Sequence, residues 1–305
     1  KRFTSQGLRL SLLDTPFEGD SPFQEQPATV LDTNGRGGMM HLPLNWPNFY
    51  SRYDALLAAN LNTQFPENRH IMWRRCRIYV AHSGFSYELN DQTMLGRTAN
   101  NGQAGFDFRV PVGNGKAVYL KLKVSMLQEQ NATQLYLKRY LTGKSDELEE
   151  ETSVGVIFRP DLEDRDFHME TKSMGALEEF WSKAVAFTQG ELLFAPDQRR
   201  KLRLVCEGAQ FHKVDEWSYN CHMSNEELRG LSSQTDLYSP GYFEAELKGG
   251  EKAILLGQIM TAQENKKLSV APVKKSSAES SYLDQLSDAI RHFVVRRDGL
   301  KTVIA

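Results

Sequence analysis

The sequence predicts a mainly β protein, a large antiparallel β-sandwich with few helices. In many short segments apolar and polar residues alternate with a period of two, the pattern of a strand with one face on a core and the other in water. Turn residues separate these segments at regular intervals, and short strands joined by turns bury their apolar faces between two sheets. The chain has 305 residues, 40% of them hydrophobic, enough for one large β-rich domain or two ordinary ones.

The first predicted element is the glycine-rich segment at residues 33–38. It lacks the Lys-Ser/Thr ending of a phosphate loop, so we expect a tight turn between strands. Residues 106–112 and 118–124 are two extended segments, and the Gly-Asn-Gly at residues 113–115 supplies the positive φ angles of a tight hairpin between them. The same alternation predicts strands at residues 135–141, 154–158, 202–204 and 253–259.

Two helices are predicted in the second half of the chain. In residues 173–188 apolar side chains recur at helical spacing, although Gly175 weakens the start. Residues 281–292 carry a second apolar stripe, and Ser281 with Asp284 fits a capping box.

These elements divide the chain into four parts. Residues 1–30 are an unassigned N-terminal extension, and residues 31–265 are the predicted sandwich. Residues 266–280, rich in Lys, Ser, Ala and Glu, are typical of a linker or exposed loop. Residues 281–305 are predicted to form a helix and then β structure, with β-rich segments at 293–296 and 302–305. Because the chain ends on apolar residues and lacks an initiator Met, we expect a piece of a longer protein.

Charge and hydropathy exclude several classes of partner. With 37 basic and 39 acidic residues the formal net charge is −2, which does not favour nucleic acid or an anionic membrane surface. No apolar run approaches the roughly 18 residues of a membrane span, and the N-terminus lacks the apolar stretch of a secretory signal. A cytoplasmic protein is the expectation.

Cysteine usage agrees with a reducing compartment. Cys76, Cys206 and Cys221 form no CxxC motif and are expected to be reduced thiols. Cys221 and His222 could ligate a metal, but a zinc site needs three or four ligands and no second Cys/His cluster occurs at ligand spacing. We therefore predict neither a metal site nor a cofactor.

Acidic clusters are the one candidate for catalysis that residue types alone suggest. Glycosidases use two carboxylates, and acids gather at residues 146–151, 161–164, 178–179 and 226–227. Adjacent acids are ordinary on a solvated face or loop, and that is how we interpret them. The GxSxG, HExxH, P-loop and GxGxxG motifs are absent from the sequence.

Two aromatic segments are candidates for carbohydrate binding. A pyranose ring packs its C–H groups on an aromatic face, while its hydroxyls need planar polar partners. Residues 46–54 and 217–220 combine both kinds of side chain, and the candidate residues are Arg52, Tyr53, Asp54, Trp217, Tyr219 and Asn220. The alternative is that these aromatic residues fill the space between the sheets, and large side chains favour that alternative.

Several short blocks then carry a resemblance. Asn34–Gly38 has the pattern Asn-Gly-x-Gly-Gly, and Arg52-Tyr53 with residues 56–59 has the pattern Arg-Tyr-x-x-Leu-Leu. Further blocks follow at residues 217–220, 227–231, 236–243, 291–297 and 301–305. In this order the blocks resemble the N-terminal domain of bacterial and archaeal-type glycogen debranching enzymes, the amylo-α-1,6-glucosidase family. Asp54-Ala55 stand where the family more usually has His-Gly, and Arg36 and Met39 also depart from its pattern.

The resemblance implies a β-supersandwich of the galactose-mutarotase type, packed in the parent enzyme against an (α/α)6 barrel that holds the catalytic acids. It therefore implies no catalytic residue in this chain. The expected partners are α-glucan chains, such as those of glycogen, and the C-terminal barrel of the same polypeptide. Two alternatives stay open. One is a stand-alone sugar 1-epimerase, for which His168, His212 and Glu207 form no recognisable acid–base pair; the other is a purely structural domain.

Overall fold

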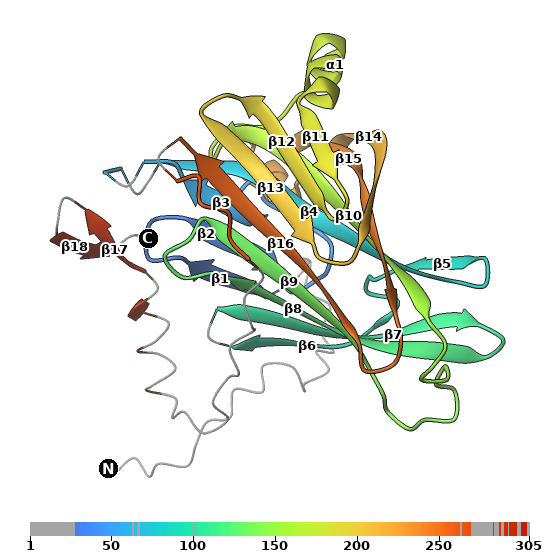
Figure 1. Cartoon of the computed structure of the whole chain (residues 1–305). Coiled ribbons are helices and arrows are strands. Elements are labelled where there is room, and N and C mark those ends of the chain that lie inside the picture. Colours follow the sequence, from blue (N-terminus) through green and yellow to red (C-terminus); the bar gives the residue numbers. More distant parts are fainter. Residues whose placement is uncertain are drawn as a thin grey trace, which may run out of the picture.

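The computed structural model describes residues 28–62, 64–65, 68–100, 102–262, 264–269, 283, 287, 290–291, 293–297 and 300–303. Within them, two antiparallel sheets of eight strands each face one another, and a separate two-stranded hairpin lies beside them (Figure 1). The predicted fold class, a large mainly β sandwich with few helices, is confirmed.

The first sheet has the order β1-β2-β3-β4-β10-β15-β14, and β5 pairs with β4. Its strands are β1 (Thr29–Thr33), β2 (Met39–Pro43), β3 (Ala55–Asn60), β4 (Arg69–His82), β5 (Phe85–Glu88), β10 (Val154–Asp166), β14 (Gln210–His222) and β15 (Gln234–Leu247). The two longest strands, β4 and β15, both pair with β10, which therefore lies at the centre of the sheet.

The second sheet has the order β11-β12-β13-β16-β9-β8-β7-β6. Its strands are β6 (Met94–Asn100), β7 (Gln103–Gly113), β8 (Lys116–Met126), β9 (Ala132–Tyr140), β11 (Val185–Thr188), β12 (Glu191–Asp197), β13 (Arg200–Cys206) and β16 (Lys252–Thr261). Five of the six segments that the alternation predicted as strands lie within β7, β8, β10, β13 and β16, and the sixth, residues 135–141, extends one residue beyond β9.

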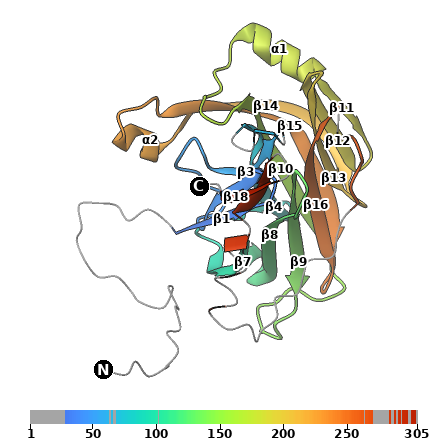
Figure 2. The same ribbon diagram turned by 90° about the vertical axis from the view of Figure 1, so that its left-hand side faces the viewer.

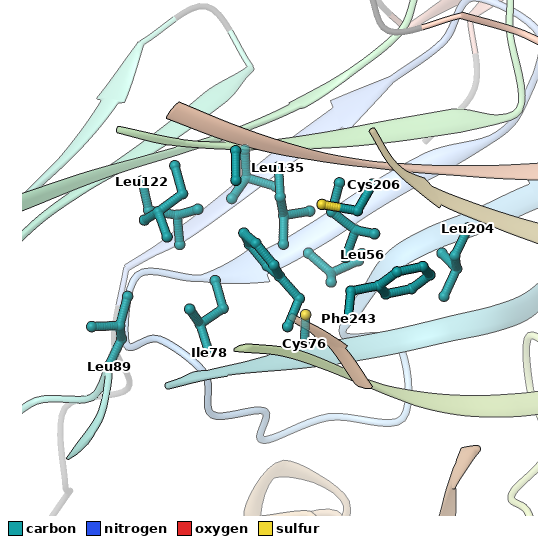
Figure 3. Packing of buried hydrophobic residues seen from close by; sticks show 14 of the residues in the cluster. Leu56, Cys76, Ile78, Leu89, Leu122, Leu135, Leu204, Cys206 and Phe243 are labelled. Atoms are coloured by element: carbon teal, nitrogen blue, oxygen red, sulfur yellow. The ribbon is translucent and has the colours of Figure 1, made fainter. Parts of the chain in front are cut away.

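The core lies between the sheets. Figure 3 shows Leu122, Leu135 and Leu204 of the second sheet opposite Ile78 and Phe243 of the first. All are fully buried, and each such side chain stabilises the fold by roughly 1.5–3 kcal/mol relative to leaving it exposed.

The three cysteines are free thiols. Cys76 and Cys206 belong to the core in Figure 3, where burial raises the pKa of both thiols, that of Cys206 to about 12. Both are therefore protonated at neutral pH and pack as small apolar groups.

Both predicted tight turns are present. Gly113, Asn114 and Gly115 all have positive φ and join β7 to β8. Residues 33–38 join β1 to β2, with Gly35 and Gly37 at positive φ, and the side-chain oxygen of Asn34 accepts the N–H groups of Arg36 and Gly38.

The helix predicted at residues 173–188 is too long. Helix α1 spans Gly175–Lys183, and Val185–Thr188 forms the edge strand β11. The β-branched and aromatic residues after Lys183 pair with β12 instead, because that pairing satisfies their backbone groups and covers an edge of the second sheet. A short helix that was not predicted, α2 (Ser224–Leu228), follows β14 directly and lies at its end in Figure 2.

The predicted helix at 281–292 lies mostly outside the described residues, and its described members, Leu283, Ser287, Ile290 and Arg291, are helical. Beyond it, β17 (Val294–Arg297) and β18 (Leu300–Val303) form an antiparallel hairpin. Strand β17 overlaps the predicted β-rich segment 293–296, and β18 begins two residues before the predicted segment 302–305, whose last two residues lie outside the described part. Residues 1–27 and 270–280, within the predicted extension and linker, are also outside the described part.

One glycine allows the two sheets to approach closely. Gly257 of β16 faces Trp73 of β4, and a Cβ at position 257 would overlap the indole ring. We expect Gly257→Ala to lower the free energy of unfolding by about 1–3 kcal/mol, because the fully buried ring has no room to move. Gly96→Ala on β6 is the matched control, since its added Cβ has nothing within 4 Å. Urea denaturation would measure both, and equal losses would contradict the proposed contact.

Candidate functional site

A buried ionic cluster of Arg74, Glu163 and Arg165 holds the loop between β2 and β3. Arg165 Nε lies 2.9 Å from Glu163 Oε1, Arg74 Nε lies 3.9 Å from Oε2, and Thr235 donates its hydroxyl to Oε1 at 2.7 Å. The guanidinium groups donate outward to backbone carbonyls: Arg74 to Ser51, Arg52 and Asp54, and Arg165 to Arg52.

The three side chains of the cluster are charged at neutral pH. Burial lowers the pKa of Arg74 to about 10. Burial alone would raise the pKa of Glu163, but Arg165 and Arg74 outweigh it and hold that pKa below its ordinary value. A buried charge persists only when it is paired and hydrogen-bonded, so the β2–β3 loop, which supplies carbonyl acceptors, is fixed by this cluster.

The predicted residues Arg52 and Asp54 lie in this loop and use their polar groups within the protein. Arg52 forms ion pairs with Glu170 and Glu226, at 2.8 and 3.2 Å, and donates to the carbonyl of His168. Asp54 is buried, and its carboxylate accepts the N–H groups of Tyr50 and Ser51 and lies 2.5 Å from Nδ1 of His41. Their contacts fix the shape of the loop.

Tyr53 is half-buried beside them. Its ring packs on Phe167 at a centroid distance of 4.8 Å, and its hydroxyl lies 3.3 Å from Nδ1 of His168. Of the three predicted residues of this segment, Tyr53 is the one with an apolar face near the surface.

The second predicted segment carries an aromatic stack that reaches the surface. Trp217 of β14 lies between Trp181 of α1, at 5.3 Å and 28°, and Tyr219, at 6.4 Å and 14°. Trp181 is buried and Trp217 packs against the core, whereas Tyr219 is 56% exposed. The Tyr219 hydroxyl donates to Glu178 of α1 at 2.9 Å. This part of the sequence therefore provides core packing and a surface ring at once.

Asn220, the last predicted residue, has a positive φ of 51°, and its N–H donates to Asp236 at 2.7 Å. It lies at an irregularity of the β14–β15 pairing, between Ser218 and Cys221. The two predicted segments are linked through α2, whose Glu226 accepts from the hydroxyl of Ser51 and the N–H of Arg52.

A polar pocket of about 440 Å³ beside the β2–β3 loop was missed at the level of sequence. It is lined by Pro47 and Asn48 of the loop, Arg75 and Arg77 of β4, and Glu88, Asn90, Asp91 and Gln92 from β5 and the turn after it. These residues come from three separate segments, and no spacing in the sequence connects them.

The acidic cluster at residues 161–164 is not solvated, contrary to expectation. Asp161 is buried and accepts hydrogen bonds from Arg75 and Arg77, while Asp164 contacts His70 and Arg200 at 2.6 and 2.7 Å. These strands carry many arginines, and each acid lies opposite one or two of them. Glu149, Glu150 and Glu151 are exposed, as expected.

Two further features bear on the kind of site present. Among the described residues no three His, Cys, Asp or Glu side chains gather in a way that could hold a metal ion. In the same part of the chain, none of the helices has the length and apolar character needed to cross a membrane.

The fold and these surfaces define a β-sandwich domain with few helices and an aromatic stack that ends in the exposed ring of Tyr219. A family described as "Glycogen debranching enzyme N terminal" matches residues 29–254, which is most of the chain. The chain belongs to this family, so the resemblance of its sequence blocks is confirmed.

The solved structures that are similar to this chain have low sequence identity to it. A bacterial glucoamylase complexed with acarbose is 10% identical, with a TM-score of 0.40, covering 83% of this chain and 35% of that chain. A heparan sulfate lyase from Pedobacter heparinus is 8% identical, with a TM-score of 0.32, covering 56% of this chain and 22% of that one. This chain thus spans 22% to 35% of the length of the two proteins. No curated protein matches it.

The ionic cluster predicts how the stability of the protein depends on pH. The pKa of Glu163 in the folded state is below its ordinary value of 4.5, so its stabilisation is complete above about pH 4.5 and is lost as the pH falls through the folded-state pKa. Glu163→Gln should cost about 3–5 kcal/mol at pH 7, because two buried arginines lose their counter-ion. The difference from wild type should shrink below about pH 4.5. Thermal unfolding across pH would measure it.

Glu179→Gln is the matched control for this substitution. Glu179 pairs with Lys183 on α1, and both side chains are more than 70% exposed. An exposed pair contributes less than about 1 kcal/mol, so this variant should follow wild type at every pH. A constant gap between Glu163→Gln and wild type down to pH 3 would contradict the assigned ion pair.

Proposed function

We propose that this chain is the non-catalytic N-terminal β-sandwich domain of a glycogen debranching enzyme. In this proposal it supports an (α/α)6 barrel with α-1,6-glucosidase activity in the same polypeptide, and it binds α-glucan chains. Family membership supports the first part of the proposal. The observation that carries the glucan contact is the exposed ring of Tyr219 on its rigid stack.

The geometry of Tyr219 suits a sugar ring. Stacking on Trp217 and the hydrogen bond to Glu178 hold the tyrosine ring in place before any ligand arrives. A preorganised side chain loses little conformational entropy on binding. Glu178, which accepts the hydrogen bond from the tyrosine hydroxyl, lies beside the ring and offers carboxylate oxygens for sugar hydroxyls.

The acidic cluster at residues 161–164, taken by itself, fits a non-catalytic role. Glycoside hydrolysis needs a carboxylic acid whose pKa is raised so that it can donate a proton, together with a second carboxylate. At the 161–164 cluster, burial would raise the pKa values of Glu163 and Asp164, but neighbouring arginines and His70 lower both. Such carboxylates are ionised and paired, which is the opposite of a general acid.

The alternative of a sugar 1-epimerase has less support. An epimerase needs its sugar between the acid and the base. His212 instead pairs directly with Glu244 at 2.9 Å and stacks on Tyr242, and His168 packs on Tyr53 and Phe167. Glu207 lines a pocket with Tyr136 and Lys138, and neither His168 nor His212 lines that pocket.

We also propose a cytoplasmic location. The support is the cysteine usage: three free thiols, two of them fully buried, are typical of a protein that works in a reducing compartment.

Electrophoresis in gels containing glycogen tests the glucan contact. Wild type should be retarded, and Tyr219→Ala should weaken binding about tenfold, equivalent to about 1.4 kcal/mol. Tyr219→Phe keeps the ring and should keep most of the binding. Phe85→Ala is the control, because Phe85 is 51% exposed on β5, well away from α1 in Figure 1.

The same protein incubated with a limit dextrin should release no glucose above a blank. Release of glucose would contradict the non-catalytic role. Failure of wild type to bind glycogen, or equal binding by Tyr219→Ala, would contradict the proposed glucan contact.

A further inference from the structure

The pocket beside the β2–β3 loop has a lining unlike that of the aromatic stack. Apart from Pro47, its lining residues carry guanidinium, carboxylate or amide groups. Ligand pockets of a few hundred Å³ usually combine an apolar wall with a few polar groups. This pocket, of about 440 Å³, is lined mainly by planar polar groups, each of which forms hydrogen bonds in its own plane.

The two arginines of the pocket are held in place by hydrogen bonds to Asp161. The carboxylate of Asp161, which is buried, accepts a hydrogen bond from Nε of Arg75 at 2.6 Å. It also accepts hydrogen bonds from Nε and Nη2 of Arg77, at 3.0 and 2.8 Å. The Arg75 guanidinium also lies over the ring of Phe49, 5.3 Å from its centroid. These contacts leave the two Nη groups of Arg75 without a hydrogen-bond partner among the described residues, so they remain available as donors.

Other residues of the pocket lining supply acceptors. The carboxylates of Glu88 and Asp91 receive no hydrogen bond from the described part of the chain, and the same holds for the side-chain amide of Gln92. Burial raises the pKa of Glu88 and of Asp91 above their ordinary values, and nearby arginines offset part of that increase. Donors and acceptors thus face one space without satisfying each other.

The charge of the lining narrows the class of ligand. Arg75 and Arg77 are opposed by Asp161, Glu88 and Asp91, so an anion such as phosphate would meet carboxylates, and a metal cation would meet guanidinium groups. A sugar hydroxyl donates one hydrogen bond and accepts others, so adjacent hydroxyls can use donors and acceptors together. A neutral polyhydroxylated ligand fits this lining best.

We propose that this pocket binds the terminal sugar units of a neutral α-glucan chain, with Arg75 donating to hydroxyls and Glu88, Asp91 and Gln92 pairing with their neighbours. The proposal rests on the proposed function, and it adds a second site that recognises hydroxyls instead of the apolar ring face. Two sites on one domain would raise the affinity for a branched polymer with many chain ends above that for a short oligosaccharide.

Titration calorimetry with maltotriose tests the proposal. Wild type should bind, and Glu88→Ala and Gln92→Ala should each weaken binding at least fivefold. Neither side chain bonds to another described side chain, so both variants should keep the wild-type melting temperature. Glu151→Ala, which removes an 85% exposed carboxylate from the β9–β10 loop, is the control and should bind like wild type.

The outcomes separate this site from that of Tyr219. Both proposals stand if Tyr219→Ala weakens glycogen binding but leaves maltotriose binding unchanged, and if Glu88→Ala weakens maltotriose binding but keeps part of the glycogen binding. If Glu88→Ala and Gln92→Ala bind maltotriose as wild type does, or wild type binds none at millimolar concentration, the pocket proposal is overturned whatever Tyr219 does. If the protein binds inorganic phosphate, and Glu88→Ala binds phosphate more tightly than wild type, the pocket is an anion site and the sugar proposal is overturned.

Discussion

The cost of burying charge governs the architecture of the first sheet. Arg74, Glu163 and Arg165 are all out of water, and such charges are stable only when every one of them has partners. Both arginines also donate to carbonyls of the β2–β3 loop, so the same cluster that joins β4 to β10 also fixes that loop. The wall of the polar pocket and the position of α2 both depend on it, because Glu226 of α2 binds Ser51 and Arg52.

The predictable part of the fold is the part in which local pattern and tertiary packing agree. The β7–β8 hairpin follows from strict alternation and a Gly-Asn-Gly turn, and nothing distant opposes it. Strand β4 was not predicted, since Arg69 and Arg74 occupy buried positions that the alternation rule assigns to apolar residues. Residues 185–188 fit a helix locally, and pairing with β12 makes them a strand.

The sequence indicated which types of residue form the candidate site, but not how exposed they are or which partners they contact in the fold. Trp217 and Tyr219 were selected as aromatic residues accompanied by polar side chains, but their exposure depends on α1, which covers one and leaves the other open. Asp54 was selected as a sugar-binding candidate, but its carboxylate accepts two N–H groups of its own loop. No local pattern could reveal its contact with His41, because His41 lies on β2.

The strand order of the first sheet has a consequence for how the protein must fold. Its central strands β4, β10 and β15 are separated by long stretches of chain, so they meet only after costly loop closure, and sheets dominated by such pairings fold slowly, in roughly milliseconds to seconds. Arg74 finds Glu163 only when β4 meets β10, and Glu163 gains Thr235 only when β15 joins them. During synthesis at the ribosome, Arg74 therefore lacks its buried partner until β10 has emerged, and Glu163 lacks Thr235 until β15 has emerged as well.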